Sequence, residues 1–283
     1  MQLGADGRVL DQRGSKAGIL SITGGAFEAT LRQLLNGWCR ESPPILMCGM
    51  IGSRQGWLEV PYVACPAGAA AVAGAIQGLD TDLGPTAIVP GIMCRPGLPD
   101  CDIMRGEETQ LFGAVAAADT GLVIAPGTHS KWVRVESGCV AAFSTHMTGE
   151  LYELLKTHSI LGRLMSAGEF DEDLYVQGVA RSLRDPALAR TLFGVRTEGL
   201  FGSIAGAALP AYLSGILIGA EVSNGLQEHG PCGGATLVGA AALLPRYARA
   251  LHMAGVAEVR CIDGVAASAR GLWNLWRLHE GKR

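Results

Sequence analysis

The sequence predicts an α/β protein with two similar lobes that face each other across a cleft. Short apolar strands alternate with helical stretches up to residue 118, and a second meander followed by strand–helix alternation begins after it. Forty glycines among 283 residues also exceed the usual share of roughly 7%, as is common where backbone segments approach a ligand closely. The expected lobes are residues 1–118 and 119–283.

The first lobe opens with a hairpin, because "ADGR" is a turn signal and a strand pattern follows it. Helices are predicted where apolar residues recur at helical spacing or small residues cluster. Strands are predicted where short apolar runs are bounded by turn residues. The predicted elements are strands at 9–13, 17–20, 44–53 and 86–92, and helices at 25–38, 66–79 and 104–117.

The second lobe starts with a three-stranded meander and continues mostly as helix. Thr148 is a candidate helix cap, and we expect the helical region to be broken at Pro186, at Gly194–Phe201 and at Pro210. We expect the last helix to pack back on the first lobe. The predicted elements are strands at 123–135 (with a turn), 139–147, 234–239 and 258–263, and helices from 148 onward, over much of 171–226, and at 241–255 and 264–280.

Composition argues against several classes of protein. The net charge is −3 without a basic block, so neither nucleic acid nor an anionic membrane is an expected partner. The eight cysteines include no C-x-x-C pair, which disfavours a zinc site and indicates reduced thiols. The first residues lack the charged start and apolar stretch of a signal peptide. We therefore expect a cytoplasmic protein.

One uncharged stretch, residues 199–220, has about the length that spans a bilayer. It is rich in glycine and alanine, however, and Pro210 stands at its midpoint. We expect two shorter elements of a soluble core that meet at "LPAYL", the second of them a buried helix that ends near Glu221.

The stretch "VIAPGTHSKWVRV" (123–135) places many hydrogen-bonding groups between two strands. Backbone N–H groups around a glycine, hydroxyls and a lysine can together hold a phosphate. The G-x-x-x-x-G-K-[ST] spacing of a P-loop is absent, so an ordinary polar hairpin is the alternative. The candidate phosphate-binding residues are Gly127, Thr128, His129, Ser130 and Lys131.

Two adjacent glutamates, Glu107 and Glu108, stand at a predicted helix start, and Arg105 precedes them. Either could take a proton from a substrate hydroxyl. The alternative is stabilisation of the helix dipole, which acidic residues in a first turn commonly provide.

Polar and aromatic residues also follow two predicted strands, where ligands of open α/β sheets bind. Arginine there suits a carboxylate, because its planar fork can bind both oxygens. The alternative is surface ion pairs. The candidate residues for a small acidic substrate are Gly52, Ser53, Arg54, Trp57 and Arg95.

Two further patterns have weaker implications. Glycines of "GGATLVG", Gly234 and Gly239, could let a nucleoside approach the backbone. The histidines show no metal-ligand spacing, so no metal ligand is assigned.

With these motifs in hand, the chain resembles the 2-dehydro-3-deoxygalactonokinases, sugar-acid kinases of the actin-like ATPase and sugar kinase superfamily. The resemblance covers nearly the whole chain. It rests on ordered blocks: "MCGMIGSRQGW", "GIMCRPGLPDCDIMRGEETQLFG", "PGTHSKWV", "MTGELYELL" with "HSIL", and "GVRTEGLFG" with "LPAYLSGILIGAE".

The resemblance implies a two-lobed actin-like ATPase (ribonuclease H-like) fold with ATP and Mg²⁺ in the central cleft. It implies phosphoryl transfer from ATP to the 6-hydroxyl of 2-dehydro-3-deoxy-D-galactonate, in galactonate breakdown. The first lobe would bind the sugar acid and supply the base, and the second would bind ATP. The preference between the galactonate-derived acid and its glucono epimer stays open, as does a homodimer.

The resemblance also implies residue roles. Gly127, Thr128, His129, Ser130 and Lys131 would approach the β- and γ-phosphates, and glycines around Gly239 would lie by the adenosine. "RGEETQLFG" is similar to the helix start that carries the catalytic glutamate of exopolyphosphatases in the same superfamily. By that comparison Glu108 is the preferred base and Glu107 the alternate.

One departure lies at the start of the chain. Family members open with a strand and an Asp-x-Gly-Thr-type turn that handles phosphate and Mg²⁺, whereas "QLGADGRVLDQR" matches the family from the end of the first hairpin onward. We expect either a coding start further upstream or an impaired protein, with an open slot in the first lobe's sheet. A phosphohydrolase of the same superfamily and a non-catalytic binding protein are the alternative functions.

Overall fold

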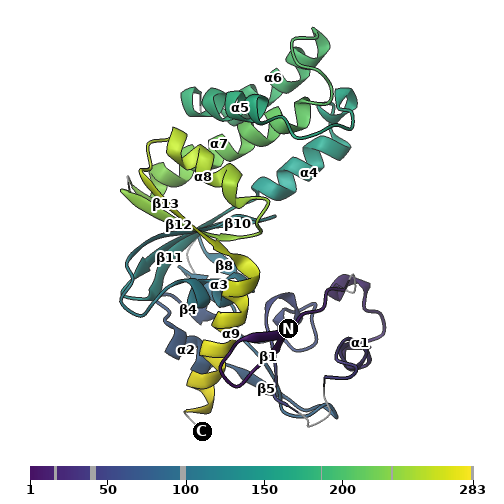
Figure 1. Ribbon diagram of the computed structural model, residues 1–283, viewed down its shortest axis with the longest axis vertical. Helices are drawn as coiled ribbons and strands as arrows, with labels where there is room; N and C mark the ends of the chain where they lie inside the picture. The colour runs from purple at the N-terminus through teal and green to yellow at the C-terminus, as the bar shows by residue number, and fades with distance from the viewer. Residues whose placement is uncertain (16–17, 39–42, 96–99, 186, 231, 282–283) are drawn as a thin grey trace. The chain divides into compact units, whose positions relative to one another are not determined.

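The computed structural model describes residues 1–15, 18–38, 43–95, 100–185, 187–230 and 232–281 (Figure 1). The chain divides into two compact units. Unit 1 comprises Met1–Thr120, Val135–Phe143 and Asp263–Arg283, and unit 2 comprises Gly121–Arg134 and Ser144–Ile262. The lobe boundary predicted between residues 118 and 119 stays a prediction.

Unit 1 contains small sheets built from two- and three-residue strands. β1 (Gln2–Leu3) and β2 (Val9–Asp11) form the predicted antiparallel hairpin. The second sheet has the order β3 (Ile45–Met47), β6 (Thr86–Ile88), β5 (Gln77–Leu79), and the third has the order β4 (Val63–Ala64), β7 (Ile92–Cys94), β8 (Asp102–Met104). In each of these two sheets one pair is parallel and the other antiparallel.

The strand predicted at 17–20 is wrong where the chain is described. Ile19–Ser21 is instead a short 3-10 helix, η1. The backbone N–H and the hydroxyl of Ser21 both donate to the carbonyl of Gly18, at 2.9 and 2.7 Å, and so close a local turn. Residue 17 lies outside the described residues.

The helices of unit 1 meet along its last helix. α9 (Gly264–Glu280) packs against α2 (Ala69–Gly74) and α3 (Glu107–Ala114). A β-carbon on Gly113 would lie 1.8 Å from the carbonyl oxygen of Ala267, and one on Gly271 would lie 1.7 Å from that of Thr109. α3 and α9 therefore touch backbone to backbone. The other helices of unit 1 are α1 (Phe27–Leu34) and the 3-10 helix η2 (Gly49–Gly52).

An apolar groove of about 360 Å³ lies in unit 1 between β1 and β3. It is lined also by α1 and α9, with Leu3, Leu35, Ile45, Met47, Leu272 and Trp276 among its walls. The β1–β2 hairpin forms a sheet of its own beside this groove.

The central element of unit 2 is a five-stranded sheet with the order β11, β10, β9, β12, β13. The predicted meander forms its first half, and β12 pairs parallel to β9, with Thr236 opposite Val123. The tip of the β10–β11 hairpin, Val135–Phe143, groups with unit 1. The strands are β9 (Gly121–Ala125), β10 (Ser130–Glu136), β11 (Cys139–His146), β12 (Gly234–Gly239) and β13 (Glu258–Asp263).

Helix α7 (Leu209–His229) runs through the core of unit 2 and packs against α5 (Figure 1). It begins at "LPAYL" as expected, with Pro210 in its first turn, where a missing N–H leaves no helical bond unmade. The predicted end near Glu221 is wrong. The helix continues because Val222 and Gly225 are buried, and a β-carbon on Gly225 would lie 2.5 Å from the Trp132 ring.

The remaining helices of unit 2 surround α7 and the sheet. They are α4 (Thr148–His158), the 3-10 helix η3 (Gly162–Leu164), α5 (Glu172–Arg184), α6 (Leu188–Leu200) and α8 (Leu244–Met253). The break predicted from Gly194 is wrong, because α6 continues through the buried Gly194 and Val195 and ends at Leu200. Among the described helices, none combines the length and the apolar character needed to span a bilayer.

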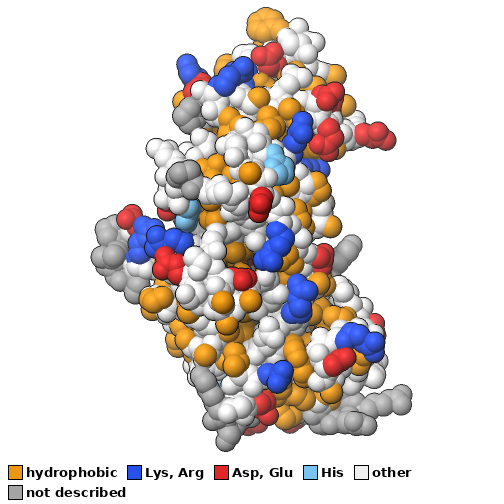
Figure 2. Space-filling view, turned by 60° about the vertical axis from the view of Figure 1, so that its left-hand side comes forward, with side chains coloured by type: hydrophobic (Ala, Val, Ile, Leu, Met, Phe, Trp, Pro, Cys, Tyr) orange, Lys and Arg blue, Asp and Glu red, His pale blue; other side chains and the backbone are white. Residues whose placement is uncertain are grey.

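Acidic and basic side chains are interspersed on the face of the molecule in Figure 2, with hydrophobic side chains between them. This face therefore carries no extended field of one sign.

We predict that Gly271→Ala destabilises the protein, although Gly→Ala inside a helix is normally stabilising by roughly 0.5–1 kcal/mol. The added methyl meets the carbonyl of Thr109, and overpacking of this kind costs about 1–3 kcal/mol. Urea unfolding curves measure the change. Gly199→Ala in α6 is the control, because its methyl meets only leucine side chains, which can move. Equal stability of both variants would contradict the backbone contact.

Candidate functional site

Two glycine turns of unit 1, 57 residues apart in sequence, lie against each other. Gly49 and Gly106 both have positive φ angles, +82° and +117°. A β-carbon on Gly106 would lie 3.3 Å from the Cα of Gly49. The contact brings η2, with the start of "GSRQGW", next to the first turn of α3. We call residues 49–54 together with 105–108 the glycine-turn site.

Arg105 packs against this site, and the sequence analysis assigned it no role of its own. Its guanidinium lies 4.2 Å from the centre of the Tyr62 ring, and its Nη2 donates to the carbonyl of Val60 at 2.7 Å. Its buried Nε and Nη1 have no partner among the described residues. Gly52 leaves room for this guanidinium, since a β-carbon there would lie 2.9 Å from Nη1. The only sequence signal for Arg105 was its position before the two glutamates.

The two glutamates differ in accessibility. Glu108 is fully buried, its Oε2 accepts from the N–H of Gly106 at 2.6 Å, and its Oε1 has no described partner. Burial raises the pKa of Glu108 to about 8, against the opposing effect of backbone hydrogen bonds. Glu107 is half-buried and accepts from the N–H of Arg105 at 3.2 Å.

The predicted substrate-binding residues after β3 have local partners. The Ser53 hydroxyl donates to the carbonyl of Met50 at 2.7 Å. Arg54 extends into solvent, with 87% of its side chain exposed, and pairs with Glu59 at 3.4 Å. Trp57 stacks on Phe27, with ring centres 6.1 Å apart. Of these residues Arg54 is the most free to approach a ligand.

The structure does not bring Arg95 to the glycine-turn site. In the β7–β8 ladder Ile92 pairs with Met104 and Cys94 pairs with Asp102. Arg95 therefore lies at the opposite end of the ladder from Arg105. It has a positive φ of 50° and forms an ion pair with Asp100 at 3.7 Å.

In unit 2, the five candidate phosphate-binding residues divide into an exposed and a buried set. Thr128 and His129 are exposed and Gly127 is half-buried, with no atom within 4 Å of its β-carbon position. Ser130 and Lys131 already belong to β10 and are buried, and Lys131 Nζ donates to the Thr145 hydroxyl at 2.8 Å. The first set faces open space, and the second anchors the turn.

The N-terminus of α4 lies directly against this hairpin. A β-carbon on Gly149 would lie 2.5 Å from the carbonyl oxygen of Gly127, so only glycine allows the approach. The N–H of Glu150 donates to the carbonyl of Thr128 at 3.1 Å, and its carboxylate lies 2.5 Å from His129 Nε2. The positive end of the helix dipole thus adjoins the exposed turn and favours an anion there.

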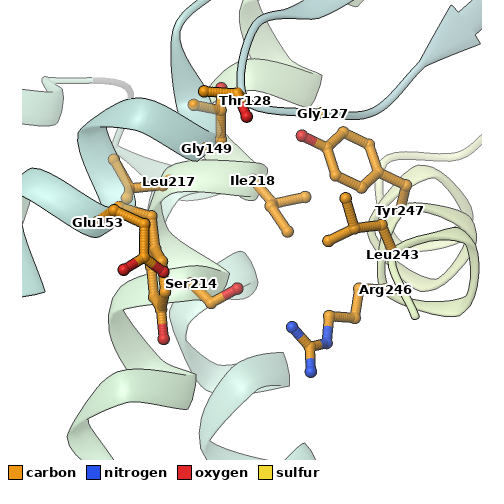
Figure 3. A pocket seen from close by; sticks show the side chains of 12 residues that line it. Gly127, Thr128, Gly149, Glu153, Ser214, Leu217, Ile218, Leu243, Arg246 and Tyr247 are labelled. Carbon is orange, nitrogen blue, oxygen red and sulfur yellow. The ribbon is translucent and has the colours of Figure 1, made fainter. Parts of the chain in front are cut away.

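A pocket of about 290 Å³ opens beside the hairpin (Figure 3). Its wall combines the hairpin with α4, α7 and α8, and Figure 3 shows Arg246 and Glu153 at its rim. Gly239 lies at the hairpin end of β12, since its β-carbon position is 3.2 Å from the carbonyl oxygen of Pro126. Gly234 lies at the other end of β12, next to Glu258. The structure therefore places Gly239 next to the hairpin, whereas Gly234 lies at the opposite end of the strand.

Within the described residues, no group of three His, Cys, Asp or Glu side chains is arranged to hold a metal ion. The seven cysteines of the described residues are all free.

Comparison with known proteins identifies relatives over nearly the full chain. The family model described as 2-keto-3-deoxy-galactonokinase matches residues 1–275. A protein of Rhizobium meliloti (strain 1021) named probable 2-dehydro-3-deoxygalactonokinase is 39% identical over 290 residues, covering 96% of this chain and 93% of the relative. The 2-dehydro-3-deoxygalactonokinase of Escherichia coli (strain K12) is 35% identical over 263 residues, covering 93% of this chain and 88% of the relative.

A solved structure shows the same fold. The crystal structure of a candidate 2-dehydro-3-deoxygalactonokinase from Sinorhizobium meliloti superposes with a TM-score of 0.89 at 38% sequence identity. The match covers 98% of this chain and 93% of that one. The predicted two-lobed actin-like fold is confirmed.

We predict that Glu108 makes stability fall as pH rises from about 5 to about 8. The pKa of Glu108 is about 8 in the folded protein and about 4.3 in an unfolded chain, so between these values only the folded state holds the proton. Glu108→Gln should remove this fall. Chemical unfolding at several pH values measures it, with the exposed Glu169→Gln as control. Parallel pH profiles for wild type and Glu108→Gln would contradict the prediction.

Proposed function

The chain belongs to the 2-keto-3-deoxy-galactonokinase family, and on that premise we propose that it phosphorylates 2-dehydro-3-deoxygalactonate. The phosphoryl group comes from ATP and is transferred to the 6-hydroxyl of the sugar acid, in galactonate breakdown. The observation that carries this proposal is the family match over residues 1–275. It favours the kinase over the phosphohydrolase and over the non-catalytic binding protein.

We assign the phosphates of ATP to the hairpin of unit 2. Three features support this: open space above Gly127, exposed hydroxyl and imidazole groups on Thr128 and His129, and the N-terminus of α4. Ser130 and Lys131 hold the hairpin in place from the buried side. The adjoining pocket of about 290 Å³, with Gly239 near the hairpin, would receive the nucleoside.

Mg²⁺ is the proposed metal, carried by the nucleotide. This ion typically binds through substrate phosphates and one or two carboxylates while it keeps several waters. Such a mode asks for fewer protein ligands than a dedicated cage, which fits the described residues. When bound, the ion would neutralise charge on the phosphates. An enzyme that depends on ATP, with free thiols, fits the expected cytoplasmic location.

We assign the sugar acid to the glycine-turn site of unit 1. Arg54 would bind its carboxylate, because a guanidinium can donate to both oxygens and this one is free to turn toward a ligand. Gly52 and Ser53 shape the turn, and Arg105 fixes it from below. Trp57 would lie at its edge.

Accessibility and charge support Glu107 over Glu108 as the base, the reverse of the preference from sequence. A general base must reach the substrate hydroxyl and be deprotonated at the working pH. Glu108 is fully buried and its raised pKa keeps it largely protonated at neutral pH, while it holds the turn through Gly106. Glu107 is half-buried on the first turn of α3.

An ADP-release assay with purified protein tests the function. We expect ADP to form only when 2-dehydro-3-deoxygalactonate is present, and phosphorus–proton NMR of the product to place the phosphate on C6. The glucono epimer, run in parallel, measures epimer preference. Phosphate release from ATP without the acid would instead indicate the hydrolase. Nucleotide binding without any turnover would indicate the binding protein.

We predict that Arg54→Ala raises KM for the sugar acid by roughly 10- to 100-fold, since a charged hydrogen bond contributes about 1.5–3 kcal/mol. KM for ATP should stay unchanged. Steady-state kinetics with the acid and with its neutral carboxamide separate loss of carboxylate recognition from a general loss of binding. The KM values of wild type and variant should differ for the acid and agree for the carboxamide. Arg249→Ala, an exposed arginine of unit 2, controls for loss of one charge. Equal losses on acid and carboxamide would refute carboxylate recognition.

We predict that Glu107→Gln lowers kcat by roughly 10²–10⁴, the usual contribution of a positioned acid or base, with little change in ATP binding. Glu108→Gln should have the smaller effect on kcat. Single-turnover kinetics and nucleotide titrations measure the two quantities. If Glu108→Gln is the damaging change, the base is Glu108; if both are mild, the pair serves only the helix start.

A further inference from the structure

Glu221 is a carboxyl group buried in the core of unit 2, far from the ends of α7. It is 3% exposed. Its Oε1 accepts from the indole N–H of Trp132 at 2.8 Å, and its Oε2 accepts from the hydroxyl of Tyr247 at 2.6 Å. The Thr148 hydroxyl is a third partner. A buried carboxyl is costly without donors, so the surrounding residues are arranged for it.

The hydrogen bonds continue from Glu221 to the hairpin. The Tyr247 hydroxyl lies 3.0 Å from the hydroxyl of Ser130, and the Ser130 oxygen accepts from the N–H of Gly127 at 3.3 Å. In Figure 3 the ring of Tyr247 extends from α8 with its hydroxyl toward Gly127. α4, α7, α8 and β10 are thus joined through one carboxyl.

Counting donors and acceptors shows in which direction the hydrogen atoms are donated along this chain of hydrogen bonds. Tyr247 has a single hydroxyl hydrogen and gives it to Glu221, so Ser130 must donate to Tyr247. The Ser130 oxygen then offers its lone pairs to the N–H of Gly127. The carbonyl of Gly127, 3.5 Å from the same hydroxyl, is the weaker alternative acceptor.

We propose that Glu221 is a positioning residue that sets the hairpin for the phosphates of the nucleotide, acting through Tyr247 and Ser130. This inference rests on the proposed function. Tyr247 and Thr148 also line the pocket of about 290 Å³, so the same residues that bind Glu221 form the wall against which a nucleoside would lie. The chain therefore joins the nucleoside pocket to the phosphate hairpin.

If Glu221 had a purely structural role, variants of its hydrogen-bond partners would lose stability but not nucleotide affinity. Matched control variants separate this structural role from the positioning role. Tyr212→Phe removes a buried hydroxyl from α7 that accepts from Arg181 at 2.9 Å. Ser182→Ala removes a buried hydroxyl that donates to the carbonyl of Ile216 at 2.8 Å. Within the described residues neither hydroxyl bonds to the hairpin, so both variants should lose stability without a change in nucleotide affinity.

The test compares Tyr247→Phe, Ser130→Ala, their double variant and Glu221→Gln with these controls in the full chain. Glu221→Gln keeps the shape, but its amide oxygen must face the Trp132 N–H, so its NH₂ faces Tyr247 and reverses the chain. Measurements are Kd for the ATP analogue AMP-PNP by calorimetry, KM for ATP and for the acid, and Tm.

Each test variant should weaken AMP-PNP binding and raise KM for ATP by roughly 3- to 10-fold, the effect of one neutral hydrogen bond. KM for the acid should stay constant. The double variant should be no worse than the worse single one, because both break one chain. If the test variants change nucleotide affinity no more than controls of equal Tm, the positioning role is wrong and the kinase assignment stands.

The two claims fail differently. If wild type binds AMP-PNP but never phosphorylates the acid, the proposed function fails, and calorimetry still decides the positioning role. If wild type binds no AMP-PNP, both fail.

Discussion

The glycine-turn site of unit 1 and the Gly127 hairpin of unit 2 each depend on a close backbone approach at a glycine. In unit 1 a β-carbon on Gly106 would lie 3.3 Å from the Cα of Gly49, at the contact that joins the residues after β3 to the start of α3. In unit 2 a β-carbon on Gly149, at the start of α4, would lie 2.5 Å from the carbonyl oxygen of Gly127. Each contact sets where a helix N-terminus meets a polar turn. A β-carbon would clash with backbone at Gly149, and at Gly106 it would be crowded and strained by the positive φ of +117°. The geometry of each proposed binding site follows from this constraint.

Two buried carboxyl groups stabilise these turns through hydrogen bonds, one directly and one through other side chains. Glu108 accepts one N–H bond from the turn that it supports, and its other oxygen has no described partner, so burial dominates and its pKa rises to about 8. Glu221 is equally buried, and burial raises its pKa as well, but hydrogen bonds from Thr148, Tyr247 and Trp132 oppose the rise. We interpret the first as a neutral support of its turn and the second as the anchor of a directed chain of hydrogen bonds.

The sequence predicted the fold class, the meander and the hairpin, because apolar runs and turn residues are local signals. It also identified the two motifs of the glycine-turn site, but not that they touch, since Gly49 and Gly106 meet only through tertiary packing. Strand register was equally hidden: Arg95 follows a strand like a ligand-binding residue, yet the β7–β8 ladder puts it at the far end from Arg105.

Burial distinguishes Glu107 from Glu108 in the structure. The sequence could not predict this difference, because the two residues are identical and adjacent. Glu221 gave no signal, because nothing in a helical pattern marks one polar residue as a core anchor.

The most direct test of this account is calorimetric titration of AMP-PNP and of the sugar acid into Gly149→Ala and Gly106→Ala. Each methyl is added at a close contact within one unit, Gly149→Ala in unit 2 and Gly106→Ala in unit 1. We expect Gly149→Ala to lose affinity for the nucleotide and keep it for the acid, and Gly106→Ala to do the reverse. Equal losses of both ligands in either variant, or a nucleotide defect in Gly106→Ala, would contradict the assignment of one ligand to each unit.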